Sequence, residues 1–333
     1  MSEFRQDAVS GDWIINVPER AKRPHDFIPP RRERPVYAKD SCPFEDLQKS
    51  GNWPPVTLVP NKEKWRVAVI PNKYPALTHA GTACAKFFKQ GPYAAAEGLG
   101  HHQLVITRDH RKNFAHLSTA AAVEVLAVMQ DGYRKMDQDP CLDYVSGFFN
   151  WGVSAGASIS HPHYQILALP IIPPDVAHSL RGSEAYFRRH KWCVHCQMLA
   201  YELKVKRRIL EKNSGALAVT PYVSREPFEV RIFPARHLPY FEKTPRRDLS
   251  GIVKVLQSSL RRIEKYLNDP DFNFFIHTAP IKDQPSYRHY HWHIEIVPKV
   301  SIPAGFELST GIEINVIDPD RAAAILRGKE ARH

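Results

Sequence analysis

The chain has 333 residues, of which 43% are hydrophobic and 24% charged, and its formal net charge is +11. These values are typical of a folded protein with one or two domains, and they exclude a disordered chain. No segment is long and apolar enough to span a bilayer, and the first residues lack the basic-then-apolar pattern of a signal peptide, so we expect a cytoplasmic protein with no membrane partner.

The positive charge indicates anionic partners, either nucleic acid or small phosphorylated molecules. Aromatic residues are scattered along the chain, and there is no Lys/Arg-rich helix or nucleic-acid-binding motif. We therefore expect small phosphorylated ligands and no nucleic acid.

The first half of the chain shows several strand patterns and one helix pattern. Strands are predicted over residues 4–9, 13–17, 65–74, 100–107 and 144–149. Residues 25–41 are rich in proline and arginine and predict a loop. Residues 118–136 predict an amphipathic helix with Ser118 or Thr119 as its N-cap.

Residues 148–170 hold the pattern with the clearest chemistry. A loop of small residues, 152–160, leads into His161-Pro162-His163-Tyr164-Gln165, which we predict to be a strand with both imidazoles and the amide on one face. The backbone N–H groups of such a loop bind phosphate well. A neutral imidazole is a nucleophile toward phosphorus, and an amide can stabilise phosphoryl oxygens. The alternative is an ordinary strand with two histidines; the loop and Gln165 together favour a catalytic site.

The second half repeats the first. Cys193-Val194-His195-Cys196 corresponds to Cys42-Pro43-Phe44-Glu45, and His291-Trp292-His293-Ile294-Glu295 corresponds to the central motif. Between them, strands over 217–222, 228–233 and 272–277 and a helix over 249–267 follow the order of the first half. We therefore predict an α+β protein made of two copies of one unit, residues 1–180 and 181–333, each an antiparallel sheet packed by a long helix. Because the second copy has Glu295 in place of the amide and no Gly/Ser loop, we expect it to be structural.

The central motif also resembles a known family. Asn150, Gly152, Gly156, Ser158 and His161-Pro162-His163-x-Gln165 are similar to the active-site signature of galactose-1-phosphate uridylyltransferases, which belong to the histidine-triad superfamily. The resemblance implies a duplicated histidine-triad fold, a homodimer with active sites near the interface, and a nucleotidyl group carried on His163 while Gln165 stabilises the phosphoryl charge. The substrate-binding residues that it implies are Arg20, Arg23, Asn72, Asn150, Ser158 and Glu307.

The repeat predicts two metal sites, which we expect to be structural zinc sites because a zinc-bound histidine cannot attack phosphorus. The first would consist of Cys42, Glu45, His110 and His161, and the second of Cys193, Cys196, His237 and His291. Alternatives for the second are a redox dithiol, buried cysteines, or the iron site of some similar proteins, which implies His277, His291 and His293 plus a glutamate. We expect Cys84 and Cys141 to be core residues, because the odd cysteine count argues against disulfides.

The implied reaction transfers UMP between a UDP-hexose and a hexose 1-phosphate. However, Ile312 and Glu313 stand where galactose-specific members of the family usually have a glutamine. Residues 304–311 resemble ADP-glucose phosphorylases, which transfer AMP to inorganic phosphate, at least as closely as they resemble the uridylyltransferases. Two other classes stay open: a nucleotide-binding protein without turnover, and a histidine-triad protein that processes nucleic-acid ends. The presence of His163, Gln165 and the loop together argues against the first, and salt-sensitive DNA binding would favour the second.

Overall fold

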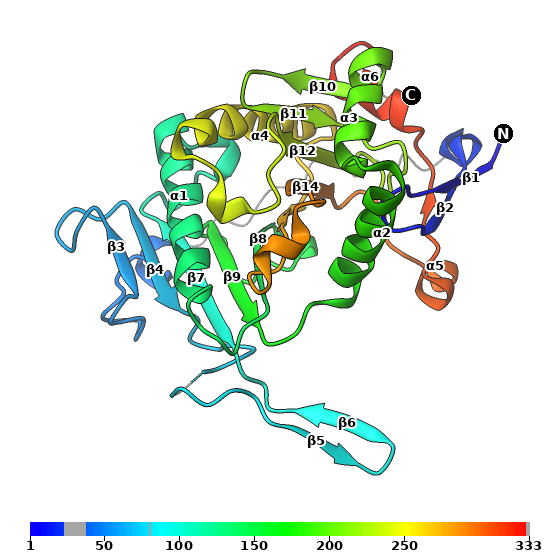
Figure 1. Cartoon of the computed structure of the whole chain (residues 1–333). Helices are drawn as coiled ribbons and strands as arrows, with labels where there is room; N and C mark the ends of the chain where they lie inside the picture. The colour runs from blue at the N-terminus through cyan, green and yellow to red at the C-terminus, as the bar shows by residue number, and fades with distance from the viewer. Residues whose placement is uncertain (23–37, 80, 331–333) are drawn as a thin grey trace.

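The protein is built on one ten-stranded antiparallel sheet, to which each half of the chain contributes five strands (Figure 1). The computed structural model describes residues 1–22, 38–79 and 81–330, so Arg23 lies outside the described residues. The first half supplies β3 (Thr57–Val59), β4 (Val67–Pro71), β7 (His101–Thr107), β9 (His163–Leu169) and β8 (Tyr144–Trp151). The second half supplies β13 (Phe272–His277), β14 (His293–Pro298), β12 (Val230–Pro234), β11 (Ala216–Val219) and β10 (Ile209–Lys212).

The strand order shows the internal repeat directly. It runs β10-β11-β12-β14-β13 and then β8-β9-β7-β4-β3, so the two sets of five mirror each other about the central β13–β8 pair. Phe274 of β13 is opposite Phe149 of β8, and Asn273 is opposite Asn150. The two copies therefore share one sheet, and the division at residue 180 remains a prediction.

Two long helices cover one face of this sheet. They are α1 (Thr119–Met136) and α4 (Arg246–Tyr266), which contact each other across the junction of the two halves (Figure 1). The Ser118 hydroxyl accepts a hydrogen bond from the Ala121 N–H, as expected of an N-cap. Apolar side chains from both helices and from both halves of the sheet form the main core. The predicted α+β histidine-triad architecture is confirmed.

Other elements were not predicted from the sequence. On the sheet face opposite α1 and α4, α3 (Val194–Val205) packs Leu199 and Leu203 against Leu217 and Phe233, with α2 (Pro174–His190) beside it. Near the C-terminus lie α5 (Gly305–Thr310), β15 (Ile314–Asn315) and α6 (Pro319–Leu326). Among the described helices, none is long and apolar enough to cross a membrane.

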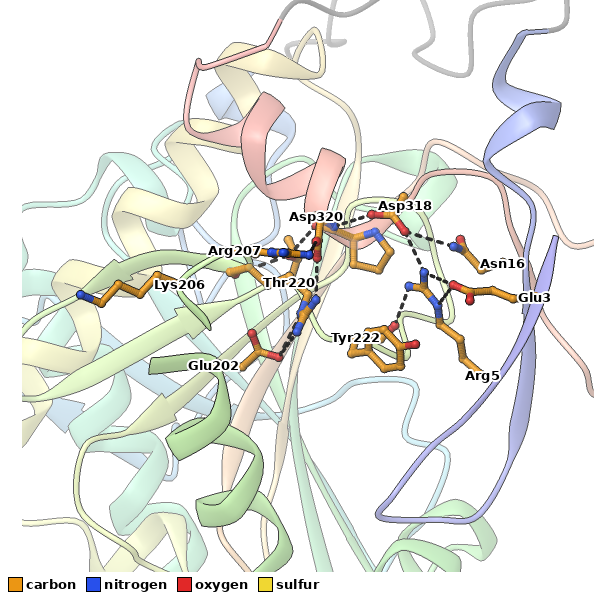
Figure 2. Close-up of polar contacts among 12 residues, drawn as sticks. Glu3, Arg5, Asn16, Glu202, Lys206, Arg207, Thr220, Tyr222, Asp318 and Asp320 are labelled. Atoms are coloured by element: carbon orange, nitrogen blue, oxygen red, sulfur yellow. Dashed lines mark hydrogen bonds and ion pairs between the residues drawn. The ribbon is translucent and has the colours of Figure 1, made fainter. Parts of the chain in front are cut away.

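The N-terminal hairpin, β1 (Glu3–Gln6) and β2 (Trp13–Asn16), lies against the second half of the chain. Strand β15 pairs with β2 in parallel, and buried Arg5 forms an ion pair of 2.8 Å with Asp318 at the start of α6 (Figure 2). Nearby, Arg208 contacts Glu202 at 2.9 Å and Asp320 at 2.6 Å. These ion pairs fix the position of α6 against the N-terminal hairpin and the second half of the sheet, because a buried charge without its partner would be costly.

The expectation for Cys84 and Cys141 is wrong. The two residues form a disulfide across 57 positions of sequence, and Cys84 is exposed rather than in the core, although Cys141 is buried. The reason is topological, because the chain between β4 and β7 passes next to the segment that connects α1 to β8. No local sequence pattern predicts this contact. After Cys84 this connection continues into a projecting hairpin, β5 (Phe87–Gln90) and β6 (Tyr93–Ala96) (Figure 1).

Candidate active site and metal-binding clusters

The central motif lies on the sheet face opposite α1 and α4. His163 begins β9 and is opposite Ile106 of β7, while Gln165 is opposite Leu104. The alternate residues Tyr164, Ile166 and Ala168 are fully buried in the main core. The predicted two-residue alternation is confirmed from His163 onward, and it places this imidazole and the amide on the face without the long helices; His161 and Pro162, predicted as part of the same strand, precede it, because proline cannot donate to the sheet.

His163 is held in the state that a nucleophile needs. Its Nδ1–H donates to the backbone carbonyl of His161 at 2.9 Å, which leaves the lone pair on Nε2. The side chain is buried, and burial lowers its pKa below the ordinary value because the charged imidazolium loses its hydration. His163 is therefore neutral at pH 7, with its lone pair on Nε2.

The orientation of Gln165 is set by a residue that the sequence did not identify, His102 of β7. The His102 Nε2–H donates to Gln165 Oε1 at 2.8 Å, and His102 Nδ1 accepts from the Ala76 N–H at 3.2 Å. Since the Ala76 contact fixes the tautomer, the carbonyl oxygen of Gln165 must face His102, and within the described part of the chain its NH₂ group has no hydrogen-bond partner. The side chain of Asn72, a predicted site residue, lies against the same imidazole, with Nδ2 3.2 Å from His102 Nε2.

The loop before the motif is held by the second half of the chain. Gly152 has φ +90°, and a Cβ there would come within 1.8 Å of Asp271 Oδ1, so only glycine fits. Asp271 accepts from the Ser154 N–H at 2.8 Å and from its hydroxyl at 2.7 Å. Ser158 is exposed on this loop.

A second contact comes from β13. Asn273 donates from Nδ2 to Asn150 Oδ1 and to the Ala155 carbonyl, both at 2.8 Å. Sequence reasoning missed Asp271 and Asn273, because their partners lie more than a hundred residues away. The loop therefore depends on the pairing of β13 with β8.

Three of the four ligands predicted for the first metal cluster come together, and Glu45 lies beside the two histidines without joining the group. Cys42, His110 and His161 place one ligand atom each within 4.8 Å of one another, and Cys42 Sγ is 3.4 Å from His161 Nδ1. Glu45 Oε1 is 2.9 Å from His110 Nδ1 and 3.8 Å from His161 Nδ1. His161 Nε2–H donates to the Thr107 carbonyl at 2.8 Å, which leaves Nδ1 for a metal.

The second predicted cluster is assembled, from Cys193, Cys196, His237 and His291. Cys196 Sγ is 3.3 Å from His237 Nδ1 and 3.6 Å from His291 Nδ1. His237 Nε2–H donates to the Arg288 carbonyl at 2.9 Å, again leaving Nδ1 for a metal. Contacts with Cys196 and His237 lower the pKa of the Cys193 thiol despite its burial, which favours the thiolate that zinc binds.

In the second half, the segment that corresponds to the central motif, His291 to Glu295, forms ion pairs within the chain. Glu295, at the position of Gln165, is opposite Arg231 of β12, and Arg231 Nε lies 3.0 Å from Glu295 and 2.7 Å from Glu229. His277, His293 and Glu295 form a group of possible metal ligands separate from His291. The residue opposite Glu295 is therefore an arginine. The residue opposite Gln165, at the corresponding position of the first half, is Leu104.

Two predicted substrate-binding residues lie away from His163 within the chain. Arg20 lies in a short 3-10 helix, Pro18–Lys22, that comes after β2, and Glu307 is in α5, where it accepts a hydrogen bond from the Ala304 N–H at 3.0 Å. Figure 1 shows α5 beside β2, on the side of the molecule away from β9. The structure brings Asn72, Asn150 and Gln165 toward His163 but not Arg20 or Glu307.

Comparisons with known proteins match this chain along its whole length. A family model described as "Galactose-1-phosphate uridyl transferase, N-terminal domain" matches residues 1–173, and one described as "Domain of unknown function (DUF4921)" matches residues 89–327. ADP-glucose phosphorylase of Arabidopsis thaliana is 34% identical over 331 residues, covering 98% of this chain and 92% of that protein. Galactose-1-phosphate uridylyltransferase of Thermotoga maritima is 25% identical over 339 residues, covering 99% of each.

The solved structures agree. The crystal structure of the Arabidopsis thaliana ADP-glucose phosphorylase with bound ADP-glucose has a TM-score of 0.84 and 32% identity, covering 98% of this chain and 99% of that one. A uridylyltransferase structure has a TM-score of 0.74 and 24% identity over 99% of this chain and 98% of its own, which shows a shared fold.

Proposed function

This chain belongs to the galactose-1-phosphate uridylyltransferase family of nucleotidyltransferases, and from that premise we propose that it transfers a nucleotidyl group through a covalent intermediate on His163. The observation that carries the proposal is the buried neutral imidazole, whose Nδ1–H is bound to the His161 carbonyl, on the same strand face as the Gln165 amide that His102 orients.

The transfer occurs in two displacements. His163 Nε2 attacks the α-phosphorus of a nucleoside diphosphate sugar; the new P–N bond forms as the bond to the bridging oxygen breaks, and the sugar 1-phosphate leaves. A phosphate oxygen of the acceptor then attacks the same phosphorus and the P–N bond breaks. Both leaving groups are weakly basic, so no strong general acid is needed. The Gln165 NH₂ group and the loop after Gly152 stabilise the charge on the phosphoryl oxygens.

We propose ADP-glucose as the donor and inorganic phosphate as the acceptor. Similarity to the Arabidopsis thaliana ADP-glucose phosphorylase is higher, at 34% identity, than to the Thermotoga maritima uridylyltransferase, at 25%. The 304–311 segment and the absence of the glutamine at 312–313 support the same choice. Transfer of UMP between UDP-hexose and a hexose 1-phosphate is the second candidate, supported by the family match over residues 1–173.

One experiment separates these candidates. The protein is incubated with ADP-glucose or UDP-glucose, quenched, and its intact mass is measured. We expect an acid-labile AMP adduct that is absent from His163→Gln. The matched control is His293→Gln, which changes the equivalent imidazole of the second half and should keep the adduct. A UMP adduct would select the second candidate. An adduct in His163→Gln would refute the nucleophile, and no adduct with either donor would point to a binding protein.

We propose that both predicted metal clusters hold structural Zn²⁺. Tetrahedral bonds of about 2.3 Å to sulfur and 2.0 Å to nitrogen separate ligand atoms by roughly 3.5 Å. The sulfur–nitrogen distances of 3.3, 3.4 and 3.6 Å fit this geometry. Because His291 groups with the two cysteines rather than with His277 and His293, zinc is favoured over iron at the second cluster. Each ion would fix the position of a cysteine-bearing segment against the sheet.

We also propose a homodimer in which Arg20 and Glu307 of one subunit complete the site around His163 of the other. Within one chain, α5, which holds Glu307, and β2, which precedes the segment with Arg20, lie on the side of the molecule away from β9, and this supports the arrangement (Figure 1). Mixing His163→Gln with Arg20→Ala under conditions of subunit exchange should restore activity to about a quarter of wild type, because half of the dimers are then hybrids with one intact site. No recovery, or a monomer in light scattering, would refute the arrangement.

A further inference from the structure

A third group of metal ligands lies apart from the two clusters described above. His79, Asp139 and Cys141 each place one ligand atom within 4.8 Å of the others. His79 comes from the connection between β4 and β7, and the other two come from the connection between α1 and β8. Both His79 and Cys141 are almost fully buried, with side-chain exposure of 4% and residue exposure of 5%, respectively.

In the imidazole of His79, Nδ1 contacts a carboxylate, and Nε2 has no hydrogen-bond partner among the described residues. Nδ1 is 2.8 Å from Asp139 Oδ2, which also lies 3.4 Å from His101 Nε2. Nε2 is buried, and among the described residues it has no hydrogen-bond partner. A buried polar atom without a partner is costly and rare in native proteins. Histidines that bind metals typically donate one ring N–H to a carboxylate and use the other nitrogen for the ion.

The disulfide brings Cys84 next to this group. Its sulfur is bonded to that of Cys141, so both sulfurs lie at the edge of the His79–Asp139 pair. A dithiol or phosphine reductant supplies two electrons, two protons add to the sulfurs, and the S–S bond becomes two thiols. Reduction therefore adds the thiol of Cys84, next to that of Cys141, to the imidazole and the carboxylate, and two thiolates, an imidazole and a carboxylate are a ligand set that suits tetrahedral zinc.

We propose that the reduced chain binds a third Zn²⁺ through Cys84, Cys141, His79 and Asp139, and that the disulfide and the metal are alternative states of this site. Binding releases the two thiol protons, because zinc takes the thiolates. Either state ties the β4–β7 connection to the α1–β8 connection. The β4–β7 connection also carries Ala76, whose N–H fixes the tautomer of His102.

The test measures zinc per chain in the full-length protein. Wild type and Cys84→Ser are reduced with tris(2-carboxyethyl)phosphine, supplied with Zn²⁺, passed over a chelating resin and analysed by mass spectrometry of the metal. Cys84 is exposed, so the serine variant should keep its fold, which thermal unfolding checks. We expect reduced wild type to retain about one zinc ion per chain more than reduced Cys84→Ser. Comparing the two under the same reducing conditions cancels zinc held by the other cysteines.

A second variant and a spectroscopic measurement support the assignment. His79→Gln keeps both thiols and should also lose the additional zinc. With Co²⁺ in place of zinc, reduced wild type should show a stronger thiolate-to-metal absorption than either variant. Equal zinc content in reduced wild type and Cys84→Ser would overturn the proposal. Alkylation that finds Cys84 and Cys141 still bonded in the natively folded, reductant-treated protein would overturn it as well.

Discussion

The contact between His102 and Gln165 predicts that replacing His102 lowers the transfer rate less than replacing Gln165 does. His102→Phe keeps a ring of similar size but removes the N–H that holds the Gln165 carbonyl at 2.8 Å. The amide can then rotate and direct its oxygen at the phosphoryl group. Losing one neutral hydrogen bond costs about 0.5–1.5 kcal/mol, which lowers the rate about 2- to 13-fold. Gln165→Ala removes the donor itself and should cost ~10²-fold or more.

The double variant tests whether His102 acts through Gln165. In a Gln165→Ala background, His102→Phe should cause no further loss, because there is no amide left to orient. The assay is the single-turnover rate of nucleotidyl adduct formation, followed by quenching and intact mass. The control is His116→Phe, an exposed imidazole paired with Glu264, which should leave the rate unchanged. If the two losses multiply in the double variant, the positioning role is refuted.

Three further predictions concern the nucleophile, the loop and the second metal cluster. Burial lowers the pKa of His163, so adduct formation should stay constant as pH falls through the ordinary imidazole value of 6.5 and decline only below it; a decline centred at or above 6.5 in a pH–rate profile would contradict this. Gly152→Ala should destabilise the fold by roughly 1–3 kcal/mol in urea unfolding, because the new Cβ meets Asp271 at a positive φ; unchanged stability would mean that the loop can move away. Cys196→Ser should lose about one zinc ion per chain and lower the melting temperature, as measured by metal analysis and calorimetry; full zinc content would show that Cys196 is not a ligand.

The features that were predictable from sequence depend on local periodicity. Alternation along 163–168 correctly separated His163 and Gln165 from Tyr164 and Ile166, because a strand side chain has only two directions. The helix at 119–136 was recognisable from its cap at Ser118 and its apolar stripe. The repeat of Cys-x-x-Cys against Cys-x-x-Glu anticipated all four residues of the second ligand group and three of the first, Glu45 being the exception.

The missing features depend on contacts between segments far apart in the chain. His102 reaches Gln165 only because β7 pairs with β9 in a register that places Leu104 opposite Gln165. Asp271 holds Ser154 only because the two halves join edge to edge. The bond between Cys84 and Cys141 follows from the path of a long connection, which carries no periodic pattern. Cys193, predicted as part of a metal motif, also stands at the N-cap position of α3 without a capping hydrogen bond from its side chain, so no capping signal marked the start of that helix.

The central pairing of β8 with β13 has a consequence for synthesis on the ribosome. β8 ends at Trp151 and β13 begins at Phe272, so 121 positions separate the two strands (272 − 151). At 5–20 residues per second, the nascent chain exposes the hydrogen-bonding edge of β8 for roughly 6–25 s before its partner emerges. An open edge of this kind recruits other strands, including the same edge of a second nascent chain. We expect a chain truncated before β13 to aggregate. We expect the full chain to need a chaperone until β13 has been synthesised and can pair with β8.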